Sequence, residues 1–144
     1  MLNRIALLAG ILTAAILCSI TTLAWDERPR TGTVITGGEM EGRGELVILN
    51  NGADDAVAAL IENRTGIVVA AVYIRGKENF RLTGIIDGIY DLYFKQGEIW
   101  NMSLERFETN ARQSRMDEPL TFETTRIPEG VRYSMAQVTI NEVP

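Results

Sequence analysis

The chain has 144 residues, a hydrophobic fraction of 46% and a formal net charge of −5. This length allows one domain, and the acidic balance argues against a nucleic-acid groove, which needs a basic surface. The sequence contains no histidine and one cysteine, Cys18. Catalysis by Ser-His-Asp or Cys-His groups is therefore excluded, as are histidine and thiolate metal sites, and we expect no cofactor.

The N-terminal 24 residues predict an apolar helix that directs the chain to a membrane. One basic residue, Arg4, precedes an apolar run from Ile5 to Ile20. The run has the length of a signal-peptide apolar region and is short for a spanning helix. Small residues before and at Ala24 fit cleavage there, but if residues 21–24 also lie in the bilayer, the segment is long enough for an uncleaved anchor. Either alternative exports the rest of the chain, as a secreted protein or as a domain anchored by residues 5–24.

Residues 25–43 are predicted to form a flexible linker. The segment is rich in glycine and in charged residues and contains few aliphatic ones. Such a composition is typical of a spacer, with room for one short strand at Thr33–Ile35. We expect the linker to separate the membrane segment from a domain over residues 44–144.

The first half of that domain shows a series of short β segments. Residues 45–50 are apolar and end at an Asn-Gly pair, which is a strong turn signal. Residues 55–62 suit a helix capped by Asp54 as well as a strand, and we interpret them as a strand because the run is short and alternates. Residues 65–75 are almost continuously apolar and β-branched, as in a central strand buried on both faces.

A turn at Asp87-Gly88 precedes the densest aromatic strand of the sequence. Tyr90, Leu92 and Phe94 fall on one face of this strand, and Tyr93 falls on the other. Further alternating segments follow at residues 106–115, 120–126 and 131–141. Seven or eight short strands with regularly spaced turns predict an all-β fold, an antiparallel β-sandwich.

The stretch LTGIIDGIYDLYF, residues 82–94, resembles a motif of carboxypeptidase-regulatory-like and transthyretin-like β-sandwiches. In those families, Pro-Gly, a small residue and Tyr stand where this chain has Asp87-Gly88-Ile89-Tyr90. The wider pattern over residues 44–140 is similar to uncharacterised exported prokaryotic proteins. The resemblance implies a sandwich that stabilises, spaces or adheres, and it implies no catalytic motif.

Two candidate sites arise from the residues themselves. Tyr93 and Trp100 are candidates for an exposed aromatic platform that binds carbohydrate or peptide, although packing in the core and between strands explains these aromatics more simply. Asn50, Asp54 and Asp55 surround one turn and are candidate calcium ligands, although Asn and Asp also favour turns for their own backbone bonds. Both sites are hypotheses, and they depend on whether the folded strands expose these side chains and bring them close together.

Carboxylates are the remaining groups for acid-base catalysis, and two neighbouring segments could bring together the five acidic residues Glu105, Glu108, Asp117, Glu118 and Glu123 in a hydrolase site. Solvated surface charge explains them more simply. We therefore expect a non-catalytic exported domain that acts through contacts with an envelope or extracellular protein or glycan. A carbohydrate- or peptide-binding module is the alternative, and no nucleic-acid partner is expected.

Overall fold

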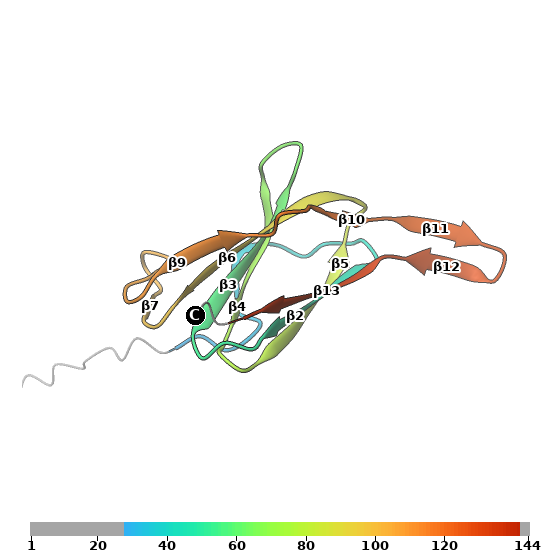
Figure 1. Ribbon diagram of the computed structural model, residues 1–144. Helices are drawn as coiled ribbons and strands as arrows, with labels where there is room; N and C mark the ends of the chain where they lie inside the picture. The colour runs from blue at the N-terminus through green and yellow to red at the C-terminus, as the bar shows by residue number, and fades with distance from the viewer. Residues whose placement is uncertain (1–27, 142–144) are drawn as a thin grey trace, which may run out of the picture.

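The computed structural model describes residues 28–141, and this range is all-β with no helix (Figure 1). The predicted all-β class is confirmed, and the predicted N-terminal helix lies outside the described residues. The described range contains thirteen strands instead of seven or eight, because residues 98–134 form pieces of two to four residues that alternation does not reveal. The strands are β1 (Val34–Gly37), β2 (Gly44–Asn50), β3 (Asp55–Glu62), β4 (Val68–Ile74), β5 (Asn79–Ile85), β6 (Gly88–Gly97), β7 (Trp100–Asn101), β8 (Arg106–Phe107), β9 (Arg112–Arg115), β10 (Leu120–Phe122), β11 (Thr124–Ile127), β12 (Gly130–Tyr133) and β13 (Met135–Ile140).

The larger sheet is antiparallel and has the order β1-β4-β3-β6-β10, with β9 also pairing with β6. β10 pairs with the first part of β6, from Gly88 to Tyr90, and β9 pairs with the second part, from Tyr93 to Gln96. β3 pairs with β6 along its whole length, so the predicted strand over residues 55–62 is confirmed. Pairing on both sides overrides the helical propensity of its alanines.

The second sheet has three strands in the order β13-β2-β5. β2 and β5 are antiparallel, as predicted, but β13 runs parallel to β2. The chain reaches β13 through the short strands β11 and β12, which bring it back to the end of the sheet where β2 begins. The fully antiparallel arrangement expected from the sequence therefore fails at this one pair.

The main apolar core combines side chains from both of these sheets. Every second residue of β2 is buried, including Leu46 and Ile48, and the predicted inward face of β6, with Tyr90, Leu92 and Phe94, is confirmed. Each fully buried large side chain contributes about 1.5–3 kcal/mol to folding. The other buried members of this cluster are Ala56, Ala58, Leu60, Val72, Ile74, Ile85, Phe122, Val138 and Ile140.

The folded domain begins before residue 44, where the sequence places its boundary. β1 forms the edge of the larger sheet, where it pairs with β4. Before β1, the Gly32 N–H donates to the Tyr73 carbonyl and the Tyr73 N–H donates to the Thr33 carbonyl. Residues 28–37, which the sequence assigns to the linker, therefore add a strand to the sheet.

Candidate functional site

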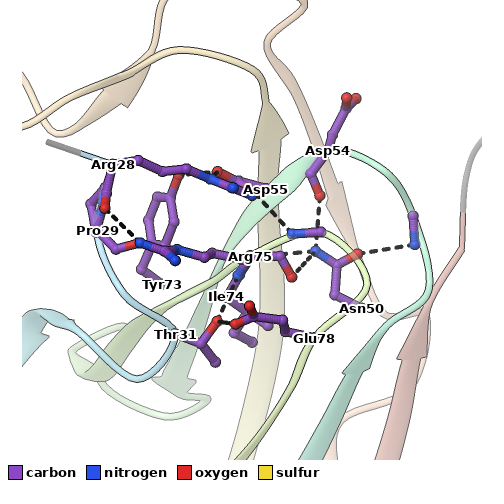
Figure 2. A network of polar contacts seen from close by, with 12 residues as sticks. Arg28, Pro29, Thr31, Asn50, Asp54, Asp55, Tyr73, Ile74, Arg75 and Glu78 are labelled. Carbon is purple, nitrogen blue, oxygen red and sulfur yellow. Dashed lines mark hydrogen bonds and ion pairs between the residues drawn. The ribbon is translucent and has the colours of Figure 1, made fainter. Parts of the chain in front are cut away.

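The carboxylate of Asp55 is the centre of a polar network that binds the N-terminal segment to the sheet (Figure 2). Arg28 donates from both Nε, at 2.7 Å, and Nη2. The Tyr73 hydroxyl donates to the same carboxylate, and the Gly76 N–H donates at 2.8 Å. We call these four residues the Asp55 cluster. Asp55 and Tyr73 are buried, whereas the Arg28 side chain is 55% exposed, so an exposed cation neutralises a buried anion.

Burial alone would raise the pKa of the Asp55 carboxyl, but the hydrogen bonds from Arg28, Tyr73 and the Gly76 N–H outweigh it and lower that pKa below its ordinary value. Burial raises the pKa of the Tyr73 hydroxyl, and its hydrogen bond to Asp55 raises it further. Asp55 is therefore ionised and Tyr73 neutral at neutral pH. The electrostatics of the cluster hold one fixed protonation state, which suits a structural fastening better than proton transfer.

Arg75 also holds the N-terminal segment, through hydrogen bonds to its backbone carbonyls and to the Thr31 hydroxyl. Arg75 Nε donates to the Pro29 carbonyl at 2.7 Å, and its Nη2 donates to the Arg28 carbonyl at 2.9 Å. The Arg75 N–H donates to the Thr31 hydroxyl, which in turn donates to Glu78. Figure 2 shows that Asp55 of β3, Tyr73 of β4 and Arg28 of the segment before β1 lie close together. The chain is thus fixed to the domain from Arg28 onward.

The calcium candidates lie beside this cluster, but their side chains have other partners. Asn50 is buried and donates to the carbonyls of Asp54, Ile74 and Arg75, while its Oδ1 accepts from the Gly52 N–H. Asp54 pairs with Arg112 at 2.7 Å. With Asp55 bound to Arg28, the three predicted ligands do not form an oxygen cage. Among residues 28–141 there is no group of three or more acidic side chains placed to hold a metal ion.

A second, smaller apolar cluster covers part of the outer face of the larger sheet. The β7–β8 hairpin packs Trp100 and Phe107 against Tyr73, with ring centroids 5.6 and 6.0 Å apart, and Trp100 and Phe107 contact each other edge to face. Trp100 is only 5% exposed. The predicted exposed platform is therefore wrong for Trp100, because the hairpin turns its ring onto the sheet.

Beside Trp100, the rest of this outer face contains a cavity of about 260 Å³. Ala59 and Ala71 are paired neighbours on β3 and β4 and leave a hollow between larger side chains. Tyr93 and Trp100, the two candidate binding residues, both line it. Its other lining residues are Ile35, Thr36, Val57, Ile61, Val68, Lys95, Glu105 and Gln113. The cavity is thus mainly apolar, with a few polar groups.

A two-stranded arm, β11–β12, extends away from the two sheets (Figure 1). Its base is fixed by Asp87, which accepts from the N–H and the hydroxyl of Thr124, and by mutual bonds between Glu123 and Ser134. Every residue of β12 is exposed, including Val131 and Tyr133. Asp87, predicted as a turn residue, therefore also orients the arm.

Three of the acidic residues considered for a hydrolase, Glu105, Glu108 and Glu123, do not lie together at one site. Glu105 lines the cavity, and Glu108 accepts from the Asn101 side chain. Glu123 lies at the base of the arm and directly follows β10. β10 pairs with the first residues of β6, whereas Glu105 and Glu108 follow the last residue of β6, Gly97. The length of β6 separates these residues, because β10 pairs with the first part of β6 and the β7–β8 hairpin follows its last residue.

The Asp55 cluster and the arm were not found from the sequence. Arg28 and Pro29 have the composition of a linker. Only Asp55, an acidic residue at the start of a strand, hints in the sequence that a buried ion pair is present. For the arm, the turn residues Pro128-Glu129-Gly130 were available. Alternation predicts continuous strands on both sides of this turn, whereas the chain leaves the sheets at Glu123 and returns at Ser134.

Comparison with known proteins gives no relative: no protein-family model, no curated protein and no solved structure matches this chain. Within residues 28–141, no helix is long and apolar enough to cross a membrane. The predicted signal peptide or anchor and its cleavage position at Ala24 lie outside this range. Function must therefore be argued from the cluster, the cavity and the arm.

Proposed function

We propose that this chain is an exported, non-catalytic domain that stays attached to a membrane by its N-terminal segment and binds a protein partner through the β11–β12 arm. The arm carries this proposal, because β12 is exposed along its whole length, Thr125 and Arg126 of β11 are exposed as well, and neither strand has a part in the two apolar clusters. The segment over residues 5–24 supports membrane attachment, because it reaches the length of a spanning helix when residues 21–24 also lie in the bilayer.

The fold that we propose for the domain is a β-sandwich similar to carboxypeptidase-regulatory-like and transthyretin-like domains. An apolar core with members from both larger sheets supports a two-layer arrangement. The turn at Asp87-Gly88 and the inward Tyr90 support the resemblance, since they stand where its motif requires a turn and a tyrosine. Such domains act mainly as interaction and spacing modules, in agreement with the proposed role.

The arm has the properties of a binding element. A two-stranded hairpin is only marginally stable by itself, so an arm outside the core gains stability from a partner. Thr124, Arg126, Val131 and Tyr133 occupy one face by their register, and Val131 and Tyr133 are 41% and 39% exposed. Each strand also has one edge without a neighbouring strand in the described residues. An extended segment of a partner protein can pair with such an edge.

The arm is expected to be needed for binding but not for folding. Joining Thr124 to Tyr133 through Asn-Gly removes the arm and keeps its base, because these residues are direct partners and Asn-Gly favours a two-residue hairpin turn. We expect the free energy of unfolding to change by less than about 1 kcal/mol. A loss of several kcal/mol in urea unfolding would show that the arm belongs to the fold.

Binding is tested in the full-length protein in its own membrane, with a photo-crosslinking amino acid at Val131. Gln137, exposed on β13, is the control position. A discrete protein adduct from Val131 that is absent from Gln137 supports the proposal. Adducts that are absent from Val131, or the same at both positions, contradict it.

A peptide-binding site in the cavity is a second candidate function, favoured because Tyr93 and Trp100 line the same hollow. The floor of alanines and the apolar walls suit an apolar peptide side chain better than a sugar, which needs many polar partners. Ala59→Leu fills the hollow and is expected to weaken peptide binding at least about tenfold, measured on a peptide array and then by titration. The control Ser114→Leu, at an exposed site on β9, should leave binding unchanged. Equal binding by both variants would place the peptide elsewhere.

A further inference from the structure

The connection between the membrane segment and the domain is much shorter than the sequence suggests. The apolar run with its flanking residues ends at Ala24, and the Asp55 cluster fixes the chain from Arg28, four residues later. Four extended residues span at most about 14 Å, whereas a linker over residues 25–43 would span roughly 60 Å. An anchored domain is therefore held close to the lipid with one particular end toward it.

The end that faces the membrane is identified by the neighbours of Arg28. Arg28 lines one hollow together with Asp54, Asp55, Gly97 and Glu98, which places it where β3 begins and β6 ends. The β7–β8 hairpin follows directly after Glu98. Figure 1 shows the loop with β7 at the end of the molecule where the described chain begins, and the arm at the opposite end.

The β7–β8 hairpin carries apolar side chains that the domain leaves uncovered. Ile99, Met102 and Leu104 are 53%, 47% and 55% exposed, although Trp100 and Phe107 of the same hairpin are buried. The hairpin thus uses two side chains to pack on the sheet and presents three others to the outside. The hairpin also carries exposed charges of both signs, Glu105, Arg106 and Glu108.

We propose that the lipid surface is the partner of this hairpin: the Asp55 cluster and the short connection hold the domain on the membrane so that Ile99, Met102 and Leu104 enter the headgroup region. The proposal rests on the membrane attachment proposed above. Aliphatic side chains fit the boundary between headgroups and acyl chains, and the charged side chains beside them can extend toward the headgroups and water. Three partly exposed side chains bind lipid weakly by themselves, so their contact depends on the short connection.

The test compares two labelled positions in the full-length protein reconstituted in vesicles of phosphatidylcholine and phosphatidylglycerol. In a Cys18→Ser background, Leu104→Cys or Val131→Cys carries an environment-sensitive fluorophore, and some lipids carry a spin label near the headgroup. Both sites are exposed, so neither label disturbs the core. We expect quenching at position 104 to be at least about threefold greater than at position 131, because only the hairpin lies at headgroup depth.

A second variant tests the short connection. A flexible Gly/Ser insert of about 12 residues after Asp26 adds roughly 20 Å of average reach and leaves the Asp55 cluster intact. It should reduce quenching at position 104 to the level at position 131. Equal quenching at both positions without the insert, or unchanged quenching with it, overturns the inference while vesicle binding still supports the anchor. An intact mass matching residues 25–144 in a soluble fraction overturns both the anchor and the inference.

Discussion

Replacing Asp55 by alanine is expected to lower the free energy of unfolding by about 3–5 kcal/mol. The substitution leaves the buried Tyr73 hydroxyl and the Gly76 N–H without their acceptor, and it leaves the Arg28 guanidinium without its anion. Removing one partner of a buried polar network costs the desolvation of every group left behind. Urea unfolding followed by far-UV circular dichroism measures the loss.

The neighbouring acid provides a matched control for this prediction. Asp54 pairs with Arg112, and the two side chains are 22% and 34% exposed. A partly exposed ion pair contributes about 1 kcal/mol or less, so Asp54→Ala should cost much less than Asp55→Ala. Equal losses for the two variants would contradict a special role of Asp55.

The pH dependence of stability checks the same network. The pKa of Asp55 is lowered in the folded state from an ordinary value of 3.8. Its contribution is therefore complete above that ordinary value and is lost as the pH falls through the lower pKa of the folded protein. The difference in stability between the natural protein and Asp55→Asn should be constant near neutral pH and should shrink below about pH 4. A difference that grows on acidification would contradict the assignment.

Trp100→Ala is expected to have the second largest effect, a loss of about 3–5 kcal/mol. The indole is 5% exposed and contacts Tyr73 and Phe107, so its removal leaves a large gap between the β7–β8 hairpin and the sheet. Hydrogen exchange should show that residues 98–111 lose protection more than the rest of the domain. This local effect is expected because the hairpin has only two paired residues in each strand.

The control for this prediction lies in the same hairpin. Leu104 is 55% exposed, and Leu104→Ala should change stability by no more than about 0.5 kcal/mol. Circular dichroism is the suitable readout, because Trp100→Ala removes a fluorophore. Similar stability of the two variants would mean that the hairpin packs only loosely.

Local patterns predicted the strands whose two faces differ. The turn at Asp87-Gly88, the strand after it and its inward residues Tyr90, Leu92 and Phe94 all follow from alternation and turn chemistry. The apolar run that ends at Ile74 was likewise recognised as a central strand, and β4 lies between β1 and β3. These features depend on residues that are close together in the sequence, so one sequence is enough to predict them.

The Asp55 cluster and the burial of Trp100 depend on contacts between distant segments. Arg28 and Asp55 are bonded across 27 positions, and no local pattern marks a linker arginine as the partner of a strand carboxylate. The sequence leaves Trp100 open between an exposed platform and the core, and the packing of its hairpin on the outer face of the sheet buries it. Tertiary packing therefore decides both, and local composition indicates neither of these contacts.

The parallel pairing of β13 with β2 has a consequence for the order of events during export. β13 is the last strand of the chain, yet it contributes Val138 and Ile140 to the main core and pairs with a strand near the start of the domain. Contacts between such distant segments form late and slowly. If the chain is exported as we propose, its core is incomplete until the C-terminal residues have crossed the membrane. An exported chain still in transit would then remain loose enough to be threaded, and it would close only when translocation ends.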